Sequence, residues 1–237
     1  MLKKERQELI YQTIKMKKYC TVSFLAKKLF VAPITVRRDL CEMEKAGLVL
    51  RCYGGASIPD YENRDIPFEL RNKSNFTAKE ALAKKAAELV SVGDVLFLDA
   101  SSTVSHIIDH LDNKQHLTII TNSTLIAEKA TERGITCYLS GGKTVDNSYA
   151  LTGEVAIKTI SDFYANICFF SSQAIDQNGV ITDYSEMETA LRRAMIKNST
   201  RQYFIFDSSK FSKRQTFKLC STDDISGVIT DLENSPF

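Results

Sequence analysis

The 237 residues leave room for one large domain, or for a small domain beside a medium one. Hydrophobic residues make up 43% of the chain and charged residues 25%, a balance that excludes a disordered or fibrous protein. No apolar stretch is long enough for a membrane span or a secretory signal, so we expect a cytoplasmic protein with no membrane partner.

The net charge of +2 is unevenly distributed along the chain. Residues 1–59 carry 12 Lys and Arg against 5 Asp and Glu, a net charge of +7. Residues 60–237 carry 19 against 24, a net charge of −5. This asymmetry indicates a polyanion-binding head on a neutral to acidic body.

The six cysteines are scattered and form no C-x-x-C pair. Their spacing fits neither a zinc site nor a disulfide framework. Most have apolar neighbours in the sequence, so we expect buried free thiols in a reducing compartment.

The first 58 residues predict a small domain of helices with a two-stranded hairpin at its end. In chain order we expect a helix over 4–16, a strand at 21–22, a helix from the N-cap Ser23 to Leu29, a helix from Pro33 to the stop signal at Gly47, and a strand over 48–50 that turns back at Tyr53–Gly55. This order is that of a winged helix-turn-helix domain.

The third predicted helix carries the chemistry of this domain. Val36, Leu40 and Met43 recur at helical spacing and should face a small core. An Arg-Arg pair on an amphipathic helix is by itself only a solvated face, but the +7 head and the basic hairpin favour insertion into a DNA major groove. The candidate DNA-binding residues are Thr35, Arg37, Arg38, Lys45, Arg51, Tyr53, Gly54 and Gly55.

Residues 59–75 read as a linker, since they hold Pro59, Asp60, Asn63, Asp65 and Pro67 and few apolar residues. Over 76–237 the chain alternates between apolar strands and helices, which predicts a doubly wound, mostly parallel α/β sheet. The strands are expected over 95–99, 117–121, 135–140, 167–171, 203–207 and 228–229, and the helices over 77–90, 103–111, 125–133, 154–160 and 186–197.

Five predicted strands end in small hydroxyl, amide or glycine residues. Ligands of open α/β sheets bind beyond the carboxyl ends of the strands, so these residues should meet on one rim. Ser101, Ser102 and Thr103 precede a predicted helix, where hydroxyl and N–H groups bind anions, and Lys210 offers a positive charge. The implied ligand is small, phosphorylated and polyhydroxylic.

Other chemistries are less well supported. No G-x-G-x-x-G or P-loop is present, so no nucleotide cofactor is expected. His106 and His110 have an i, i+4 spacing but lack the Glu of a zincin, so we place them on a helix face near the sheet and expect no metal site. Ser101 is not within G-x-S-x-G.

Several charged side chains admit a second interpretation. Five carboxylates could act in acid–base pairs in a sugar isomerase, although ligand-hydroxyl binding or helix capping is the preferred reading, and we expect no catalytic residue. The lysines of the segment 78–89 are expected on a solvated helix face. The carboxylates are Asp99, Asp176, Glu186, Glu188 and Asp207, and the lysines are Lys79, Lys84 and Lys85.

The segment Thr35-Val36-Arg37-Arg38-Asp39-Leu40, followed by Glu44, Gly47 and Arg51-Cys52-Tyr53-Gly54-Gly55-Ala56, resembles the DeoR family of bacterial transcriptional regulators. The remainder is similar to the sugar-phosphate-sensing domain of that family, whose fold resembles ribose-5-phosphate isomerase. The resemblance implies a regulator of sugar catabolism, expected to be a repressor, that binds double-stranded DNA as a homo-oligomer (a dimer or tetramer) and responds to a phosphorylated sugar. A phosphosugar isomerase with an added basic head is the alternative.

The same resemblance implies a set of effector contacts. At three positions the sequence differs from the residue that is usual in the family. Ala32 replaces the usual Ser before the third helix, Tyr53 the usual His of the wing, and Ser101 the usual Gly of the phosphate loop. The effector contacts carried over are Ser101, Ser102, Thr103, Asn122, Gly142 and Lys210, to which Asp99 is added as a ligand-hydroxyl partner.

Overall fold

The computed structural model describes residues 2–17, 19–46, 48–52, 54–57, 68–112, 116–146, 148–233 and 235–237. It divides at Arg71–Asn72 into two compact units, which are described separately. Among the described residues, no helix combines the length and apolarity needed to cross a bilayer.

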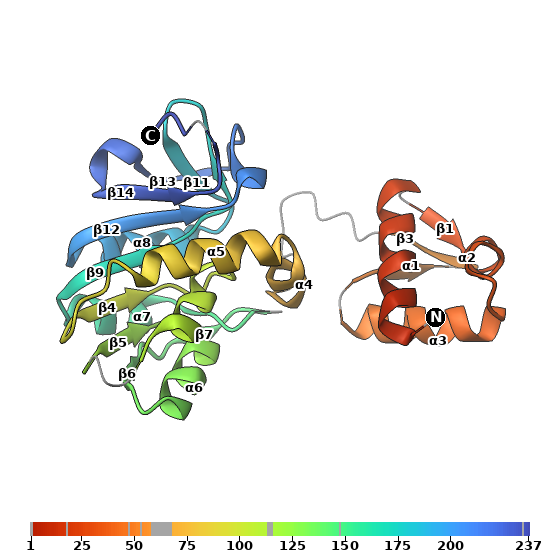
Figure 1. Ribbon diagram of the computed structural model, residues 1–237, viewed down its shortest axis with the longest axis horizontal. Coiled ribbons are helices and arrows are strands. Elements are labelled where there is room, and N and C mark those ends of the chain that lie inside the picture. The colour runs from red at the N-terminus through yellow and green to blue at the C-terminus, as the bar shows by residue number, and fades with distance from the viewer. Residues whose placement is uncertain are drawn as a thin grey trace. The chain divides into compact units, whose positions relative to one another are not determined.

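The N-terminal unit has the winged helix-turn-helix order that the sequence predicts (Figure 1). Three short antiparallel strands form a sheet in the order β1-β3-β2. Ile10, Ile14, Leu25, Leu40 and Met43 fill the core between the helices and this sheet. The elements are α1 (Lys3–Lys17), β1 (Tyr19–Thr21), α2 (Val22–Leu29), α3 (Pro33–Lys45), β2 (Leu50–Cys52) and β3 (Gly55–Ser57).

Two details of this unit differ from the sequence prediction. The second helix begins at Val22, because the hydroxyl of Thr21 rather than Ser23 accepts the N–H of Phe24 at 3.1 Å. The strand expected over 48–50 starts only at Leu50, since Val49 is a buried core residue before the strand.

Most of the predicted linker, residues 59–67, lies outside the described residues, as does Gly47, the predicted stop of the third helix. The final part contains a helix that the sequence analysis did not expect, α4 (Phe68–Lys73).

The C-terminal unit is built on a six-stranded parallel sheet in the order β14-β12-β9-β4-β5-β6. The predicted mostly parallel α/β class is therefore confirmed. The strands are β4 (Val95–Leu98), β5 (Thr118–Thr121), β6 (Thr136–Leu139), β9 (Ala165–Phe170), β12 (Ser199–Phe206) and β14 (Gly227–Thr230). The main helices are α5 (Phe76–Ala87), α6 (Thr124–Glu132), α7 (Glu154–Ser161) and α8 (Glu186–Lys197), together with the 3₁₀ helix η1 (Val104–His110).

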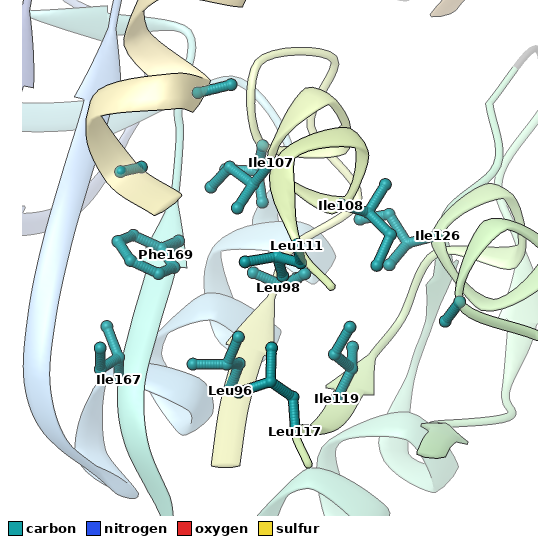
Figure 2. Close-up of a cluster of buried hydrophobic side chains, with 14 of the residues drawn as sticks. Leu96, Leu98, Ile107, Ile108, Leu111, Leu117, Ile119, Ile126, Ile167 and Phe169 are labelled. Carbon is teal, nitrogen blue, oxygen red and sulfur yellow. The ribbon is translucent and has the colours of Figure 1, made fainter. Parts of the chain in front are cut away.

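Both faces of the sheet are covered, because successive strand residues point to opposite sides. Leu96 and Leu98 of β4 pack in one cluster with α5, η1 and α6, whereas Phe97 packs in a second cluster with α7 and α8. Figure 2 shows the first cluster, in which Ile167 and Phe169 of β9 adjoin Leu96 and Leu98. Residues buried on both faces explain why these strands are almost continuously apolar.

Short antiparallel elements complete this unit and were not predicted. One sheet has the order β10-β11-β13, and a hairpin joins β7 to β8. The strands are β7 (Lys143–Thr144), β8 (Leu151–Thr152), β10 (Ala174–Ile175), β11 (Val180–Asp183) and β13 (Phe217–Ser221).

The five cysteines with described side chains are free thiols, as expected. Cys20, Cys168 and Cys220 are buried, and Cys137 is half-buried. Burial raises the pKa of Cys137 to about 11 and that of Cys220 to about 12, so both remain protonated at neutral pH.

The turn between α2 and α3 contains an unusual residue, Phe30, at a φ of 53° with its side chain 95% exposed. A non-glycine residue in this left-handed region carries about 1–2 kcal/mol of strain, and Phe30 buries almost no surface in return. Phe30→Gly should therefore stabilise the N-terminal unit by up to about 1 kcal/mol, measured by hydrogen exchange of α2 and α3 amides in the full chain. Phe30→Ala, which keeps the strained backbone conformation, is the control. Equal hydrogen-exchange protection of α2 and α3 in the two variants would show that Phe30 is not strained.

Candidate functional site

The inward side of α3 forms a partly buried ion pair with α1. Arg6 donates from Nε to Asp39 Oδ2 at 2.5 Å and from Nη2 to Asp39 Oδ1 at 3.1 Å. Asp39 is 2% exposed and has the same inward orientation as Val36, Leu40 and Met43. The hydrogen bonds to Asp39 raise the pKa of Arg6. A bidentate contact of this kind sets the rotation of α3 about its axis.

The outward side of α3 presents the two predicted arginines. Arg37 and Arg38 are exposed, and within the described residues neither makes an ion pair with a carboxylate. Thr35 is half-buried beside them. Ala32 provides no side-chain cap, as its replacement of serine predicts, and the N–H of Thr35 donates instead to the carbonyl of Ala32 at 2.9 Å. The guanidinium groups of Arg37 and Arg38 are therefore accessible to a polyanion.

The wing brings a second cation to this unit. The N–H of Arg51 donates to Glu44 Oε1 at 3.0 Å, and its guanidinium lies 3.7 Å from Glu44 Oε2. Gly55 has no room for a side chain, because a Cβ would lie 2.3 Å from the carbonyl oxygen of Cys20. Lys45 and Gly54 are exposed, and Tyr53 lies outside the described residues.

In the C-terminal unit the carboxyl ends of β9, β4 and β5 lie side by side. Asp99, which follows β4, is 1% exposed and connects the end of β4 to the end of β9 through hydrogen bonds. Its Oδ1 accepts the N–H of Ser101 at 3.1 Å, and its Oδ2 accepts the N–H of Ser171 at 3.2 Å. Both oxygens of this predicted ligand residue are thus engaged within the protein.

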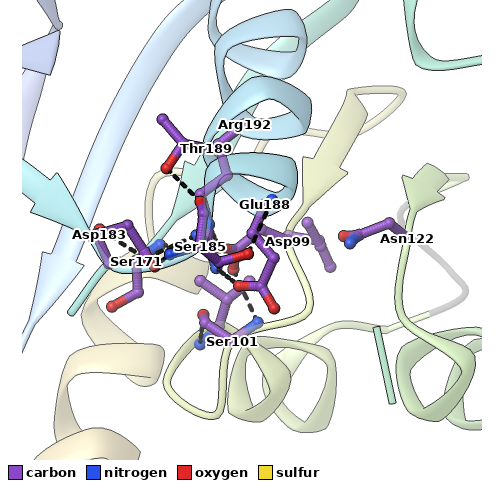
Figure 3. A network of polar contacts seen from close by, with 12 residues as sticks. Asp99, Ser101, Asn122, Ser171, Asp183, Ser185, Glu188, Thr189 and Arg192 are labelled. Atoms are coloured by element: carbon purple, nitrogen blue, oxygen red, sulfur yellow. Dashed lines mark hydrogen bonds and ion pairs between the residues drawn. The ribbon is translucent and has the colours of Figure 1, made fainter. Parts of the chain in front are cut away.

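The strongest electrostatic feature of this edge is Arg192 of α8, which the sequence analysis did not single out. Its guanidinium contacts three carboxylates: Asp99 at 2.7 Å, Asp183 at 2.9 Å and Glu188 at 2.8 Å (Figure 3). Burial opposes the charge, but the three carboxylates raise the pKa of Arg192 above its ordinary value. The sequence does contain one signal for this ion pair, because Glu188 and Arg192 have the i, i+4 spacing at which side chains of opposite charge meet on a helix.

The loop from Ser101 to Thr103 leads into η1 rather than into the α-helix that the sequence predicted over 103–111. All three residues are buried. The hydroxyl of Ser101 accepts the N–H of Val104 at 3.2 Å, and the carbonyl of Ser101 accepts the N–H of Ser105 at 3.0 Å. Ser101 stands where the family usually has glycine. Its hydroxyl therefore accepts a hydrogen bond from one of the backbone N–H groups of this loop.

Lys79 of α5 reaches the same loop, so its predicted place on a solvated face is wrong. It is 3% exposed, and its Nζ donates to Ser102 Oγ at 3.1 Å. Lys84 and Lys85 are exposed, as expected. Lys79 faces inward because it shares a helical face with the core residues Leu82 and Ala83.

Two buried polar atoms at this edge have no hydrogen-bond partner within the described part of the chain. They are Asn122 Oδ1 and Ser171 Oγ, at the ends of β5 and β9. The amide nitrogen of Asn122 is engaged, donating to the carbonyl of Leu151 at 3.0 Å. Buried acceptors and hydroxyls normally find partners, so these two atoms are the unsatisfied polar groups of this edge.

The remaining predicted residues lie farther along the rim. Lys210, after β12, donates to the carbonyl of Ser172 at 2.8 Å. Gly142 has a φ of 106°, and a Cβ there would lie 2.5 Å from the carbonyl oxygen of Thr152. Gly142 is thus required by its own backbone geometry.

The carboxylates considered for acid–base catalysis are mostly engaged by the protein. Asp99 and Glu188 contact Arg192, while Asp176 accepts from Arg214 at 3.1 Å, a contact that lowers the pKa of Asp176. Asp207 accepts from Asn75 at 2.8 Å and from Ser209. Burial opposes the charge of Asp207, but these hydrogen bonds lower its pKa.

Replacing Arg192 with Leu should lower the free energy of unfolding by about 3–5 kcal/mol, because the buried Asp99 and Asp183 and the partly buried Glu188 lose their counter-charge. The loss should shrink as the pH falls, since protonated carboxyls need no cation. Urea denaturation of the full chain measures it. Arg201→Leu, which removes only the 40% exposed partner of Asp94, is the control and should cost at most about 1 kcal/mol. Equal losses of unfolding free energy in Arg192→Leu and Arg201→Leu would show that the contacts of Arg192 contribute no more to stability than a surface ion pair.

Comparison with known proteins gives matches in both units. The family model of the DeoR-like helix-turn-helix domain matches residues 6–62, and that of the DeoR C terminal sensor domain matches residues 74–232. Among solved structures, ribose 5-phosphate isomerase A from Methanocaldococcus jannaschii matches with a TM-score of 0.44 and 18% identity, over 58% of this chain and 55% of that chain.

Two curated relatives match along nearly their whole lengths. The lactose phosphotransferase system repressor of Staphylococcus aureus (strain NCTC 8325 / PS 47) is 30% identical over 239 residues, covering 99% of this chain and 94% of the relative. The glycerol-3-phosphate regulon repressor of Escherichia coli (strain K12) is 28% identical over 232 residues, covering 98% and 92%. With both units matched in order, the chain belongs to the DeoR family of transcriptional regulators.

Proposed function

We propose that this protein is a DNA-binding repressor of sugar-metabolism genes whose affinity for its operator is controlled by a phosphorylated sugar. The observation that carries the proposal is the two-sided build of α3. Asp39 is held inward by Arg6 while Arg37 and Arg38 stay exposed. A helix fixed on one side and cationic on the other is suited to the major groove.

On the DNA side, the proposed contacts divide by role. Arg38, Thr35 and Arg37 are the candidates for base edges and nearby phosphates, because they lie in the N-terminal half of α3. Lys45 at the end of α3 and the wing residues Arg51, Tyr53, Gly54 and Gly55 are the candidates for the phosphate backbone. Two such heads on a homo-oligomer, a dimer or tetramer, would recognise half-sites separated by whole helical turns.

On the effector side, the cations and the unpartnered polar atoms support a phosphorylated, hydroxylated ligand. Lys79 and Lys210 reach the rim through their contacts with Ser102 and Ser172 and supply positive charge for a phosphate. Asn122 Oδ1 and Ser171 Oγ supply hydrogen-bond groups for sugar hydroxyls. The names of the two relatives, a glycerol-3-phosphate regulon repressor and a lactose phosphotransferase system repressor, support this ligand class.

The isomerase alternative needs a carboxylate free to move a proton on the ligand. Of the five carboxylates considered for it, Asp99 and Asp176 both have arginine partners and backbone donors. We therefore propose that the sugar phosphate is a signal that is bound and released unchanged.

The DNA contacts can be tested on sequences selected by the full-length protein from a random duplex pool. Arg38→Ala should lose about 1–3 kcal/mol of discrimination between the selected site and its variants. Lys45→Ala should instead weaken binding to every sequence and reduce the slope of log affinity against log salt by about 1. Lys85→Ala, an exposed lysine of the C-terminal unit, should change neither. Binding insensitive to salt would overturn the proposal.

The effector site can be tested by thermal shift with glycerol 3-phosphate, pentose and hexose phosphates, the parent sugars and inorganic phosphate. A true effector at 100 times its dissociation constant stabilises the protein by about 2.7 kcal/mol. Lys79→Met should abolish that shift and Lys85→Met should keep it. Ser101→Gly should enlarge it, because the N–H of Val104 becomes free for the phosphate. Turnover of any sugar phosphate in the same panel would favour the isomerase.

A further inference from the structure

The segment that leads into α3 is apolar and exposed, although residues 1–59 carry a net charge of +7. Phe30 is 95% exposed and Ile34 is 54% exposed, and Ala32 and Pro33 between them are exposed as well. None of these four residues belongs to the core of the N-terminal unit. Single apolar residues are ordinary on a protein surface, but a run of neighbours forms a patch that indicates a contact with another molecule.

One residue of this patch lies on the face of α3 that carries the arginines. Ile34 precedes Arg37 by three residues and Arg38 by four, so these side chains are neighbours on the helix surface. Val36 and Leu40, on the opposite side, are buried in the core. The exposed face of α3 is thus apolar in its first turn and cationic in the next. A major groove that accepts the arginines therefore also meets Ile34.

The chemistry of the major groove limits what an isoleucine side chain can contact there. Base edges in this groove present hydrogen-bond acceptors and amino donors, and the one apolar group is the C5-methyl of thymine. Covering a donor or acceptor with Ile34 would remove it from water without a new partner, which is costly. Contact with a thymine methyl sacrifices no hydrogen bond and buries apolar surface on both sides.

We propose that Ile34 specifies a thymine in each operator half-site by packing against the C5-methyl group of that base. The four residues from Ile34 to Arg38 advance about 6 Å along the helix. Successive base pairs are about 3.4 Å apart, so the thymine lies within about two base pairs of the base that Arg38 contacts. The assignment rests on the proposed function, because it requires α3 to lie in the major groove.

The test replaces each thymine of the site selected by the full-length protein with deoxyuridine, one at a time. This exchange removes only the methyl group and keeps every hydrogen-bonding edge of the base. One replacement in each half-site should weaken binding by wild type about 3- to 5-fold, the effect of one buried methyl group. The sensitive thymine should lie within about two base pairs of the position at which Arg38→Ala relaxes specificity.

Variants at position 34 connect this sensitivity to the side chain. Ile34→Ala should bind the thymine site at least about 3-fold more weakly than wild type and lose most of the thymine–uracil difference. Ile34→Val should retain most of that difference, since it keeps a branched apolar side chain. The matched control is Leu9→Ala, which truncates a 48% exposed side chain of α1 and should change neither quantity. Alanine is the best helix former, so weaker binding by Ile34→Ala does not come from a less stable α3.

Three results would overturn the proposal. They are tolerance of uracil at every thymine, a thymine–uracil difference that persists unchanged in Ile34→Ala, and equal affinity of wild type and Ile34→Ala for the selected site. Each of them, found together with salt-dependent binding and discrimination by Arg38, would leave the proposed DNA-binding function standing. Failure of the wild type to select any sequence would instead overturn both proposals.

Discussion

The C-terminal unit depends on the guanidinium of Arg192, which joins the ends of two strands to a helix. Asp99 follows β4, Asp183 ends β11, and Glu188 lies on α8 itself, so a single cation connects strand ends of two different sheets to a helix. Without it, the two buried carboxylates and the partly buried Glu188 would repel one another at high cost. The same contacts orient Asp99, which in turn holds the N–H groups of Ser101 and Ser171. The geometry of the candidate effector site follows from this network.

An effector that binds at this edge meets a surface that is organised before it arrives. The loop 101–103 is buried and already hydrogen-bonded to itself, which limits the donors it can offer to a phosphate. Positive charge comes instead from Lys79 and Lys210 on neighbouring elements. A ligand that contacts both Lys79 and Lys210 bridges α5 and the segment after β12. Its binding energy therefore depends on how these two elements pack against each other. A ligand changes DNA binding only through such a difference between two states.

Much of the fold could be predicted because its rules are local. Apolar runs gave the strands of the parallel sheet, and helical spacing gave the inward face of α3. Lys79 was assigned to a solvated face from its charge alone, and Arg192 was not singled out; in both cases the position of the residue on its helix relative to the apolar residues was not considered. Lys79 lies one helical turn before Leu82 and Ala83, and Arg192 one turn before Met195, so both belong to buried stripes. The 3₁₀ form of η1 and the two-residue strands β7, β8 and β10 leave no periodic signal, since they are too short to repeat a pattern.

The bidentate contact between Arg6 and Asp39 gives the start of the chain a part in reading DNA. A protease that clips the chain after its sixth residue removes no group from the proposed DNA surface. It nevertheless leaves Asp39, which is 2% exposed, without its counter-charge, and an unpaired buried charge is costly. Val36, Leu40 and Met43 would still hold α3 in the core, but one of the contacts that set its rotation, and with it the position of the two proposed DNA-contacting arginines, would be lost. We therefore expect the proposed DNA contacts of α3 to depend on an intact first turn of α1, more than thirty residues away in the chain.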